Sequence, residues 1–304
     1  MSHKNEILYK YYSKLPLSYF DKPNLKISPP ETLNDPFESV IPEYLKSLTI
    51  KDTREKYELD LTKDGKPRDN SSAQLLNEME YLGMLRSIGV ISLSETSRNL
   101  LMWAHYANNH QGFCIGYDSK LIGNEDSEDE RLPISTSPVK IKYNNCRFDF
   151  TNISININES HHEKLKSILL HILTTKSDEW IYEKEYRIIL PLRNCDEVYY
   201  LGKDSSIQKQ INEIQPRNYK KSYTFISNEP DFMFAKNISK KDIKSIHFGC
   251  RIDPIIENEI LNKVLNDDEY KHVMLYKYKT NSNRFELDNQ CFNYALREKN
   301  PLAQ

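Results

Sequence analysis

The chain has 304 residues, of which 38% are hydrophobic and 11% aromatic, as expected for a packed globular protein rather than a disordered one. Its 42 basic and 44 acidic residues give a net charge of −2, which offers no electrostatic reason for strong non-specific binding to nucleic acid or an anionic membrane. Only eight glycines are present, without a glycine-rich phosphate loop, an H-E-x-x-H motif or a G-x-S-x-G elbow. P-loop NTPases, typical Rossmann dehydrogenases, zincins and serine hydrolases are therefore disfavoured.

The five cysteines are scattered and never form a C-x-x-C pair, which favours a reducing compartment over a disulfide framework. Residues 1–6 lack the apolar core of a signal peptide. No apolar stretch approaches the roughly 20 residues that span a bilayer. We therefore expect a cytoplasmic protein with no membrane partner.

Strands are predicted where β-branched and aromatic residues alternate or cluster. In chain order they are 7–12, 25–28, 88–94, 112–117, 138–143, 183–190, 197–201, 222–227, 243–248 and 272–278. Helical spacing is found at 42–61, 72–87, 98–110, from 160 to 172, and at 254–266. In the second of these helices, Leu75, Leu76, Met79 and Leu82 form the expected apolar stripe. The acidic run 125–130 is expected to be a solvated loop.

Helices and strands are mixed without regular βαβ alternation, which favours an α+β fold over a doubly wound sheet. We expect a mixed, mostly antiparallel, split sheet flanked by helices. The chain is interpreted as a single elaborated domain, 1–304. It would carry a helical insertion at about 42–87 and a C-terminal strand–helix–strand extension at about 243–290.

Two polar-aromatic segments outside the late strand are candidates for a working site. In Asn34-Asp35-Pro36-Phe37-Glu38, two carboxylates stand beside an aromatic ring, although turn formation by Asn34 or Asp35 explains the same residues. In the segment 103–106, Trp103, His105 and Tyr106 could either pack structurally or face a ligand as hydrogen-bond donors.

The third segment, 180–187, reads Trp-Ile-Tyr-Glu-Lys-Glu-Tyr-Arg. Strand alternation would place Glu183, Glu185 and Arg187 on one face, where their charges are costly to bury without purpose. Two neighbouring carboxylates also raise the pKa of one of them, which suits acid–base chemistry. The alternative is an exposed face on which Arg187 simply pairs with Glu185.

The order of these motifs is more specific than any one of them. N-D-P-F-E, then W-A-H-Y-A with H-x-G-F, then W-x-x-E-x-E-Y-R closely resembles a bacterial family of uncharacterised proteins, the domain of unknown function twenty-nine seventy-one. The resemblance spans roughly residues 9–248. It implies no settled reaction, although such proteins are met in bacterial defence islands.

A more distant resemblance is to ADP-ribosyltransferases, which carry a polar residue on a first strand, S-x-S on a later strand and E-x-E on the last. Here Tyr9 and Lys10 stand on the first strand, Ser92-x-Ser94 on a middle one and Glu183-x-Glu185 on a late one. The usual first-strand Arg or His is replaced by Lys10 or Tyr9. The resemblance implies an ADP-ribosyltransferase-like fold and a glutamate that stabilises positive charge at the nicotinamide ribose.

The leading hypothesis is a defence-associated bacterial toxin or effector with NAD as its substrate and no metal. It would cleave NAD or transfer ADP-ribose to a macromolecular acceptor, either protein or nucleic acid, and a partner protein from a defence operon is possible. Glu185 is the expected catalytic carboxylate, with Glu183 assisting and Arg187 orienting phosphate or Glu183. Residues expected to contact NAD are Tyr9, Lys10, Asn34, Asp35, Ser92, Ser94, Trp103, His105 and Tyr106.

Two alternatives stay open. One is a Mg²⁺-dependent nuclease that uses Asp35, Glu38, Glu183 and Glu185 as oxygen ligands, in which case EDTA would abolish activity. The other is a non-catalytic sensor or partner-binding module, in which changes to the pocket would abolish binding without any turnover to lose.

Overall fold

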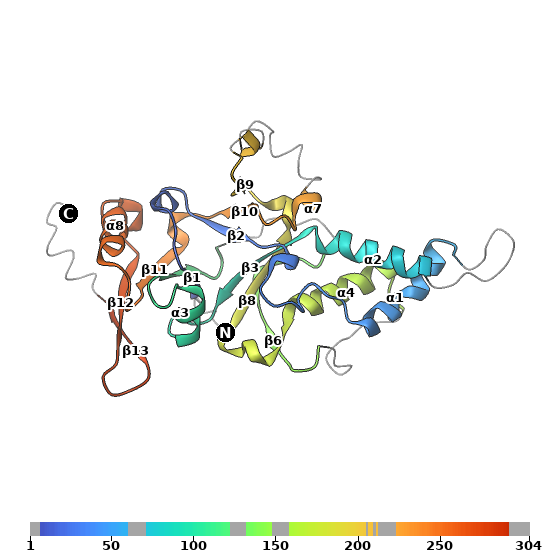
Figure 1. The fold of residues 1–304 in the computed structure, drawn as a ribbon, viewed down its shortest axis with the longest axis horizontal. Coiled ribbons are helices and arrows are strands. Elements are labelled where there is room, and N and C mark those ends of the chain that lie inside the picture. Colours follow the sequence, from blue (N-terminus) through green and yellow to red (C-terminus); the bar gives the residue numbers. More distant parts are fainter. Residues whose placement is uncertain are drawn as a thin grey trace.

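One large sheet organises the molecule (Figure 1). The computed structural model describes residues 7–59, 71–121, 132–147, 158–204, 206–208, 211 and 223–291. In spatial order the strands are β13 (Leu287–Cys291), β12 (Met274–Thr280), β11 (Ile243–Phe248), β4 (Phe113–Asp118), β1 (Ile7–Tyr12), β3 (Ile88–Ser94), β8 (Glu185–Pro191) and β5 (Ser135–Lys140). Neighbouring strands are antiparallel except β11 and β12, which are parallel. The expected mixed, mostly antiparallel α+β architecture is confirmed.

Of the neighbouring strands in the large sheet, β1 and β3 are paired over the shortest length. These two strands share a single residue pair, Tyr9 opposite Ser94. By contrast, β3 pairs with β8 over its whole length, and β1 pairs with β4 in the same way. Because an unpaired stretch of two neighbouring strands leaves room between them, this junction is where a pocket can open.

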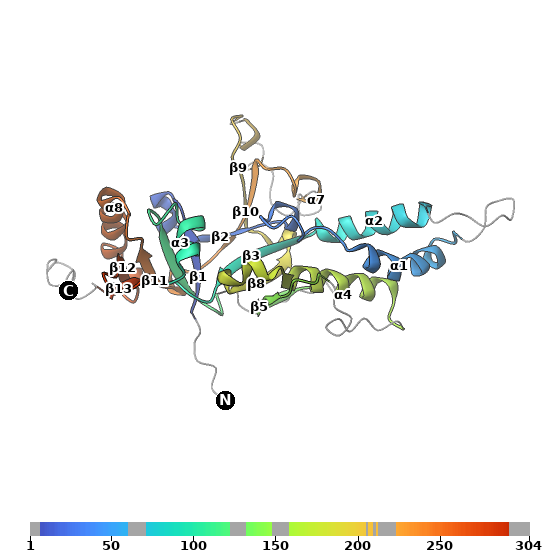
Figure 2. The same cartoon turned by 60° about the horizontal axis from the view of Figure 1, so that its bottom comes forward.

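Two smaller sheets and several helices surround the large one (Figure 2). The three-stranded sheet contains β2 (Asn24–Ile27), β10 (Phe232–Asn237) and β9 (Glu197–Tyr200), and β6 (Lys142–Tyr143) pairs with β7 (Thr175–Lys176). The α-helices are α1 (Glu43–Lys56), α2 (Ser71–Leu85), α3 (Leu100–Tyr106), α4 (His161–Thr174), α7 (Tyr223–Ile226) and α8 (Pro254–Leu265). The 3₁₀ turns are η1 (Leu17–Phe20), η2 (Pro30–Thr32), η3 (Asp178–Glu183), η4 (Leu192–Asn194), η5 (Lys240–Asp242) and η6 (Asp268–Tyr270).

The cores follow the alternation of the strands. On β4, Phe113, Ile115 and Tyr117 enter the largest core, whereas Cys114 faces a second cluster that contains Trp103. The division follows from the strand geometry, because successive strand residues point to opposite faces. In α4, Leu165, Ile168, Leu169 and Ile172 are buried, and the Ser160 side chain accepts from the backbone N–H of Glu163.

The predicted apolar face of α2 is wrong. Leu75 and Met79 are 60% and 59% exposed, and the buried residues are Ala73, Asn77, Tyr81 and Leu85. A polar contact with α1 is part of the buried side, since Thr53 donates to the Asn77 side chain. A stripe that contains Asn77 cannot be found by counting apolar residues.

Two predicted strands also differ from the structure. Residues 222–227 were predicted to be extended, but Tyr223–Ile226 form the short helix α7, and a four-residue apolar run does not distinguish the two by periodicity. The run 138–143 is divided between β5 and β6. It leaves β8 after Ile141, whose N–H donates to the Glu185 carbonyl at 2.9 Å, and Lys142 then pairs with β7.

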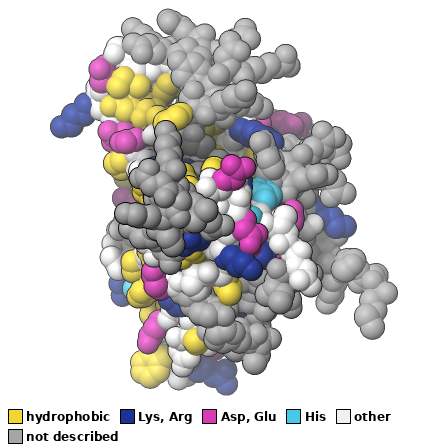
Figure 3. All heavy atoms as spheres, turned by 90° about the vertical axis from the view of Figure 1, so that its right-hand side faces the viewer, with side chains coloured by type: hydrophobic (Ala, Val, Ile, Leu, Met, Phe, Trp, Pro, Cys, Tyr) yellow, Lys and Arg dark blue, Asp and Glu magenta, His cyan; other side chains and the backbone are white. Residues whose placement is uncertain are grey.

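Among the described residues at the end of the molecule where α1, α2 and α4 lie side by side, Figure 3 shows acidic and basic side chains interspersed. Lys164 of α4 pairs with Asp52 of α1 at 2.8 Å, and Lys46 of α1 pairs with Glu78 of α2 at the same distance. These cross-helix pairs hold the three helices in register. The acidic run 125–130 lies outside the described residues. None of the described helices has the length and apolar character that crossing a membrane requires.

Candidate functional site

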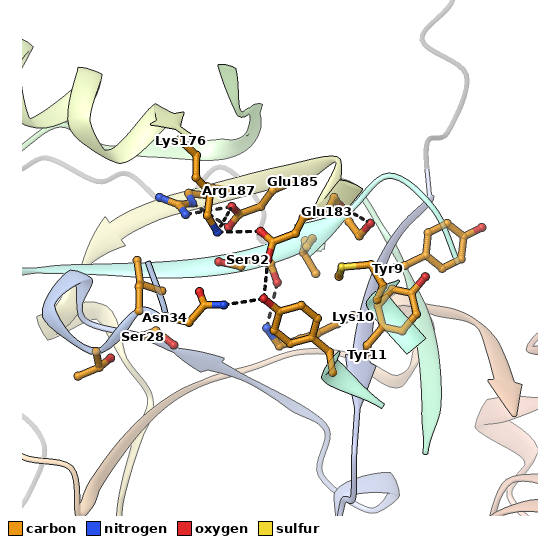
Figure 4. A pocket seen from close by; sticks show the side chains of 16 residues that line it. Tyr9, Lys10, Tyr11, Ser28, Asn34, Ser92, Lys176, Glu183, Glu185 and Arg187 are labelled. Atoms are coloured by element: carbon orange, nitrogen blue, oxygen red, sulfur yellow. Dashed lines mark hydrogen bonds and ion pairs between the residues drawn. The ribbon is translucent and has the colours of Figure 1, made fainter. Parts of the chain in front are cut away.

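A pocket of about 180 Å³ opens at the junction between β1 and β3 (Figure 4). Lys176 and Arg187 lie at one end of it, and Tyr9 lies at the other. The pocket brings together nine of the residues that the sequence pattern predicted for a site: Tyr9, Lys10, Asn34, Ser92, Ser94, Tyr106, Glu183, Glu185 and Arg187.

Three motif positions occupy one row across the sheet. Tyr9 of β1 is paired with Ser94 of β3, and Ser94 is paired with Glu185 of β8. Ser92 is paired with Arg187 in the same ladder. Side chains at such positions are neighbours across strands, so residues from three distant parts of the chain meet at the pocket.

Glu183 and Glu185 do not share a strand, and the predicted strand face is corrected here. Glu183 ends η3, Lys184 adopts a left-handed backbone with φ of 46°, and Glu185 begins β8. The turn at Lys184 nevertheless leaves both carboxylates near one amine. Lys176 Nζ lies 2.7 Å from Glu183 and 3.6 Å from Glu185.

Lys176 is central to the site, and the sequence patterns did not identify it. Its amine also lies 3.2 Å from Glu38, so three carboxylates surround it. Burial lowers the pKa of Lys176, but the three glutamates outweigh this and raise it to about 12. Charge balance offered the signal, because three buried carboxylates need more positive charge than Arg187 alone supplies.

Arg187 is 1% exposed, and each of its nitrogens has a partner. Nε and Nη2 donate to the two oxygens of Glu185 at 2.8 and 2.9 Å, Nη2 also donates to Glu38, and Nη1 donates to the Leu173 carbonyl. Burial alone would raise the pKa of Glu185, but Arg187 and Lys176 outweigh it and hold the pKa at about 2. The Arg187–Glu185 pair exists, but it is buried and not on an exposed face.

Glu183 is in a different state. Its Oε1 accepts a hydrogen bond from Tyr106 at 2.5 Å, and the Tyr106 oxygen in turn accepts from the Asn34 amide at 2.6 Å. The pKa of Glu183 is raised, chiefly by burial and further by Glu185, although Lys176 and Tyr106 oppose the shift. The Ser94 hydroxyl donates to the Glu183 carbonyl at 2.7 Å and fixes this corner.

Lys10 lies on the opposite wall from these carboxylates. Its amine donates to the Ser92 carbonyl at 2.9 Å, and burial lowers its pKa to about 8, with Lys26 adding to the effect. Tyr9 presents its ring edge to His247, with ring centroids 5.6 Å apart.

Three predicted contact residues lie outside this pocket. Asp35 is buried and accepts from the Phe37 N–H at 2.9 Å, as the turn interpretation predicted. Trp103 is fully buried, and its indole N–H donates to the Ser97 carbonyl at 2.8 Å. His105 is exposed beside Tyr182, with ring centroids 5.9 Å apart. These three side chains therefore do not line the pocket, although Tyr106 of the segment 103–106 does.

Three of the four carboxylates that the nuclease alternative requires surround the amine of Lys176. Glu38, Glu183 and Glu185 each face Lys176, whose charge balances theirs, whereas Asp35 is engaged in its own turn. Within the described part of the chain, no group of three or more His, Cys, Asp or Glu side chains is arranged to hold a metal ion.

Comparison with known proteins finds one match. No curated protein and no solved structure matches the chain. The family model "Protein of unknown function (DUF2971)" matches residues 102–188, the stretch that runs from α3 to β8 and includes Tyr106, Lys176, Glu183, Glu185 and Arg187. The predicted resemblance to this family of proteins of unknown function is confirmed over residues 102–188.

Proposed function

We propose that this protein is an ADP-ribosyltransferase-like enzyme that binds NAD in the pocket between β1 and β3. It would transfer ADP-ribose to a macromolecular acceptor or cleave NAD. The observation that carries the proposal is the row of Tyr9, Ser94 and Glu185 across three neighbouring strands. Motifs that resemble those of ADP-ribosyltransferases in sequence are thus also neighbours in space, beside a pocket.

Glu185 suits the central step of such chemistry. When nicotinamide leaves with the electrons of the glycosidic bond, positive charge develops at C1′ of the ribose. A carboxylate fixed nearby stabilises this charge, and it does so most strongly where water is excluded. Glu185 is 4% exposed, and Arg187 and Lys176 keep it ionised.

Glu183 is the better candidate for proton transfer. Two carboxylates whose surroundings move their pKa values in opposite directions can be assigned different roles. The pKa of Glu183 is raised and so lies closer to neutral pH than that of an ordinary glutamate. A general base works best when its pKa is near the working pH. In this assignment Glu183 takes the proton from the hydroxyl that attacks C1′, either of water or of the acceptor.

Other residues would position Glu185 or contact NAD. Arg187 orients Glu185, because its donors are committed to protein acceptors rather than open to a phosphate. Lys10 donates to a backbone carbonyl and can offer positive charge to the pyrophosphate. The rings of Tyr9 and Tyr106 flank the space that nicotinamide would occupy.

Release of nicotinamide from NAD tests the proposal. Purified protein should convert NAD to free nicotinamide, with or without a protein or RNA acceptor, and at the same rate in EDTA. Activity on nucleic acid that EDTA abolishes would instead favour the magnesium nuclease. Binding of NAD without nicotinamide release, under all acceptor conditions, would support a sensor and contradict an enzyme.

A further inference from the structure

Helix α2 carries a second apolar face, directly opposite its buried side. The buried residues recur every four positions, at Ala73, Asn77, Tyr81 and Leu85. At about 100° per residue, the opposite side of the helix carries a set of residues that we call the outer face. These are Ser72, Leu75, Leu76, Met79 and Gly83. The described part of the chain leaves more than half of the surface of Leu75 and of Met79 uncovered.

The neighbours of α2 turn charged side chains to water, as surface helices normally do. Lys51 and Glu55 of α1 are exposed, and so is Glu163 of α4. The helix α2 lies at the same end of the molecule (Figure 1), yet its outer face has no charged residue. A helix that is apolar on two opposite sides is normally buried on both, so the outer face is expected to be covered by a partner.

The two acidic residues of α2 are already engaged within the molecule. Glu78 lies 2.8 Å from the amine of Lys46, and Glu80 contacts Lys56 and His161. These contacts lead back to α1 and α4, away from the outer face. A strongly charged partner such as nucleic acid therefore meets no complementary charge there, whereas two copies of the face can meet without like-charge repulsion.

The outer face is also complementary to itself in shape. A Cβ at Gly83 would meet no atom of the described chain within 4 Å, so the face has a recess one turn beyond Met79. If two copies of α2 pack antiparallel about a twofold axis at Met79, Leu75 of each copy lies opposite Gly83 of the other. A large side chain then fills each recess, and the two flexible methionines meet at the centre.

The position of α2 in the molecule selects the antiparallel arrangement. β3 begins at Ile88, shortly after α2 ends, so the large sheet lies at the C-terminal end of the helix (Figures 1 and 2). Antiparallel helices place the two sheets at opposite ends of the contact, where they do not collide. We infer that the outer face forms the contact of a homodimer, in which α2 packs antiparallel against α2 of a second copy.

Sedimentation equilibrium of the full-length protein tests this inference and does not use NAD. Stable interfaces usually bury roughly 1,200–2,000 Å² in total, and one pair of four-turn helices stays below that range. We therefore expect a monomer–dimer equilibrium with a dissociation constant of about 10–100 µM.

Met79→Glu should abolish the dimer, because two carboxylates would face each other across the twofold axis. Its melting temperature should equal that of the wild type, since Met79 is largely exposed. The matched control is Ile255→Glu, which changes a 68% exposed apolar residue on α8 at the other end of the molecule (Figure 1). This control should dimerise as the wild type does.

Gly83→Leu tests the arrangement of the two helices. It fills the recess that Leu75 of the second copy would occupy, so the dissociation constant should rise at least about tenfold. The melting temperature should not fall, because the new side chain enters open space and leucine favours a helix more than glycine does.

Three results would overturn the inference. The first is a protein that stays monomeric at about 300 µM, well above the expected dissociation constant. The second is a dimer that survives in Met79→Glu or Gly83→Leu, or one that is lost equally in Ile255→Glu. The third is a monomer that binds phosphatidylcholine vesicles and loses this binding in Met79→Glu, because lipid and not a second copy would then cover the outer face.

Discussion

Glu183 and Glu185 are two residues apart in the chain, but their partners hold them in different states. Arg187 donates hydrogen bonds to both oxygens of Glu185. Glu183 instead accepts from the neutral hydroxyl of Tyr106 and from the amine of Lys176. The difference arises at the turn in Lys184, which directs the two carboxylates to separate neighbours.

Glu185→Gln should reduce nicotinamide release about a hundredfold, the effect of removing one well-placed electrostatic group from a transition state. The fold should persist, because glutamine retains an acceptor for Arg187. The matched control is Glu38→Gln, which removes another carboxylate from Arg187 and Lys176 but does not line the pocket. Both variants should melt at lower temperature, and only Glu185→Gln should lose turnover per folded molecule. Equal losses of turnover in the two would show that Glu185 acts only through stability.

The acidic limb of the pH–activity profile should report Glu183. Its pKa in the folded protein is raised above the ordinary value of 4.5, so activity should decline at a higher pH than for an ordinary glutamate. The hydrogen bond from Tyr106 favours the ionised form, and Tyr106→Phe should therefore move the limb to higher pH. Initial rates at constant ionic strength measure this directly. A limb at or below pH 4.5, or one that Tyr106→Phe does not move, would remove Glu183 as the base.

The same two groups affect stability in opposite senses. Because the folded pKa of Glu185 is about 2, its stabilising contribution is complete above pH 4.5 and is lost as the pH falls toward 2. Glu183 has a raised folded pKa, so stability declines as the pH rises from 4.5 through that value. Acid unfolding is therefore expected to depend on Glu185 and not on Glu183.

Local patterns identified most pocket residues but could not assign burial. Nine predicted residues line one pocket because charged and polar side chains within apolar strands are costly unless they have a role. Trp103 and Asp35 were predicted from the same segments, but their polar atoms are satisfied by nearby backbone. Lys176 was not predicted because it lies on the two-residue strand β7, which is too short to show a periodicity in the sequence.

At the scale of elements, α3 positions Met102 and Tyr106 in the pocket wall, and the N-cap residue Asn99 fixes the start of this helix. The Asn99 side-chain oxygen caps the helix by accepting from the N–H groups of Leu101 and Met102. Its amide donates to the Tyr182 carbonyl at 3.0 Å and so ties α3 to η3, which carries Glu183. Asn99 therefore links the helix that carries Tyr106 to the turn that carries Glu183.

Asn99→Ala should cost about 1 kcal/mol of unfolding free energy, the usual value for a lost N-cap. For a chain of this size that corresponds to about 2 °C in melting temperature. Asn99→Asp keeps the cap and loses the amide donor, so it should restore most of the stability but not the turnover. Thermal melting and nicotinamide release on the same samples separate the two roles. Full turnover in Asn99→Asp would mean that the link to η3 is unimportant.

Element types were more predictable than element faces. Strands such as β3, β4 and β11 were predicted because they are rich in apolar residues that are β-branched or aromatic. The buried face of α2 was not predicted correctly, because Asn77 and Tyr81 are buried against neighbours that lie far away in the chain. Burial of a polar residue is decided by its partner, and a partner distant in sequence is invisible to a local pattern.

On the scale of the whole molecule, the narrow junction between β1 and β3 is the decisive feature. Strand order could not be derived from periodicity, since each strand pattern fits many neighbours. Only the motif resemblance suggested that the segments at 9, 92–94 and 183–185 belong together, and the paired row Tyr9–Ser94–Glu185 brings them together. Beyond β1, the strands β4, β11, β12 and β13 extend the sheet away from the pocket (Figure 1).

The central claim is that this junction is the NAD site. The most direct test is a crystal structure of the Glu185→Gln variant grown with millimolar NAD, in which turnover should be slow enough to retain the substrate. We predict density for nicotinamide and its ribose between Tyr9 and Tyr106, with the ribose within hydrogen-bond distance of residue 185. NAD bound elsewhere on the molecule, or a pocket without NAD in crystals whose solution binding is saturated, would contradict the account.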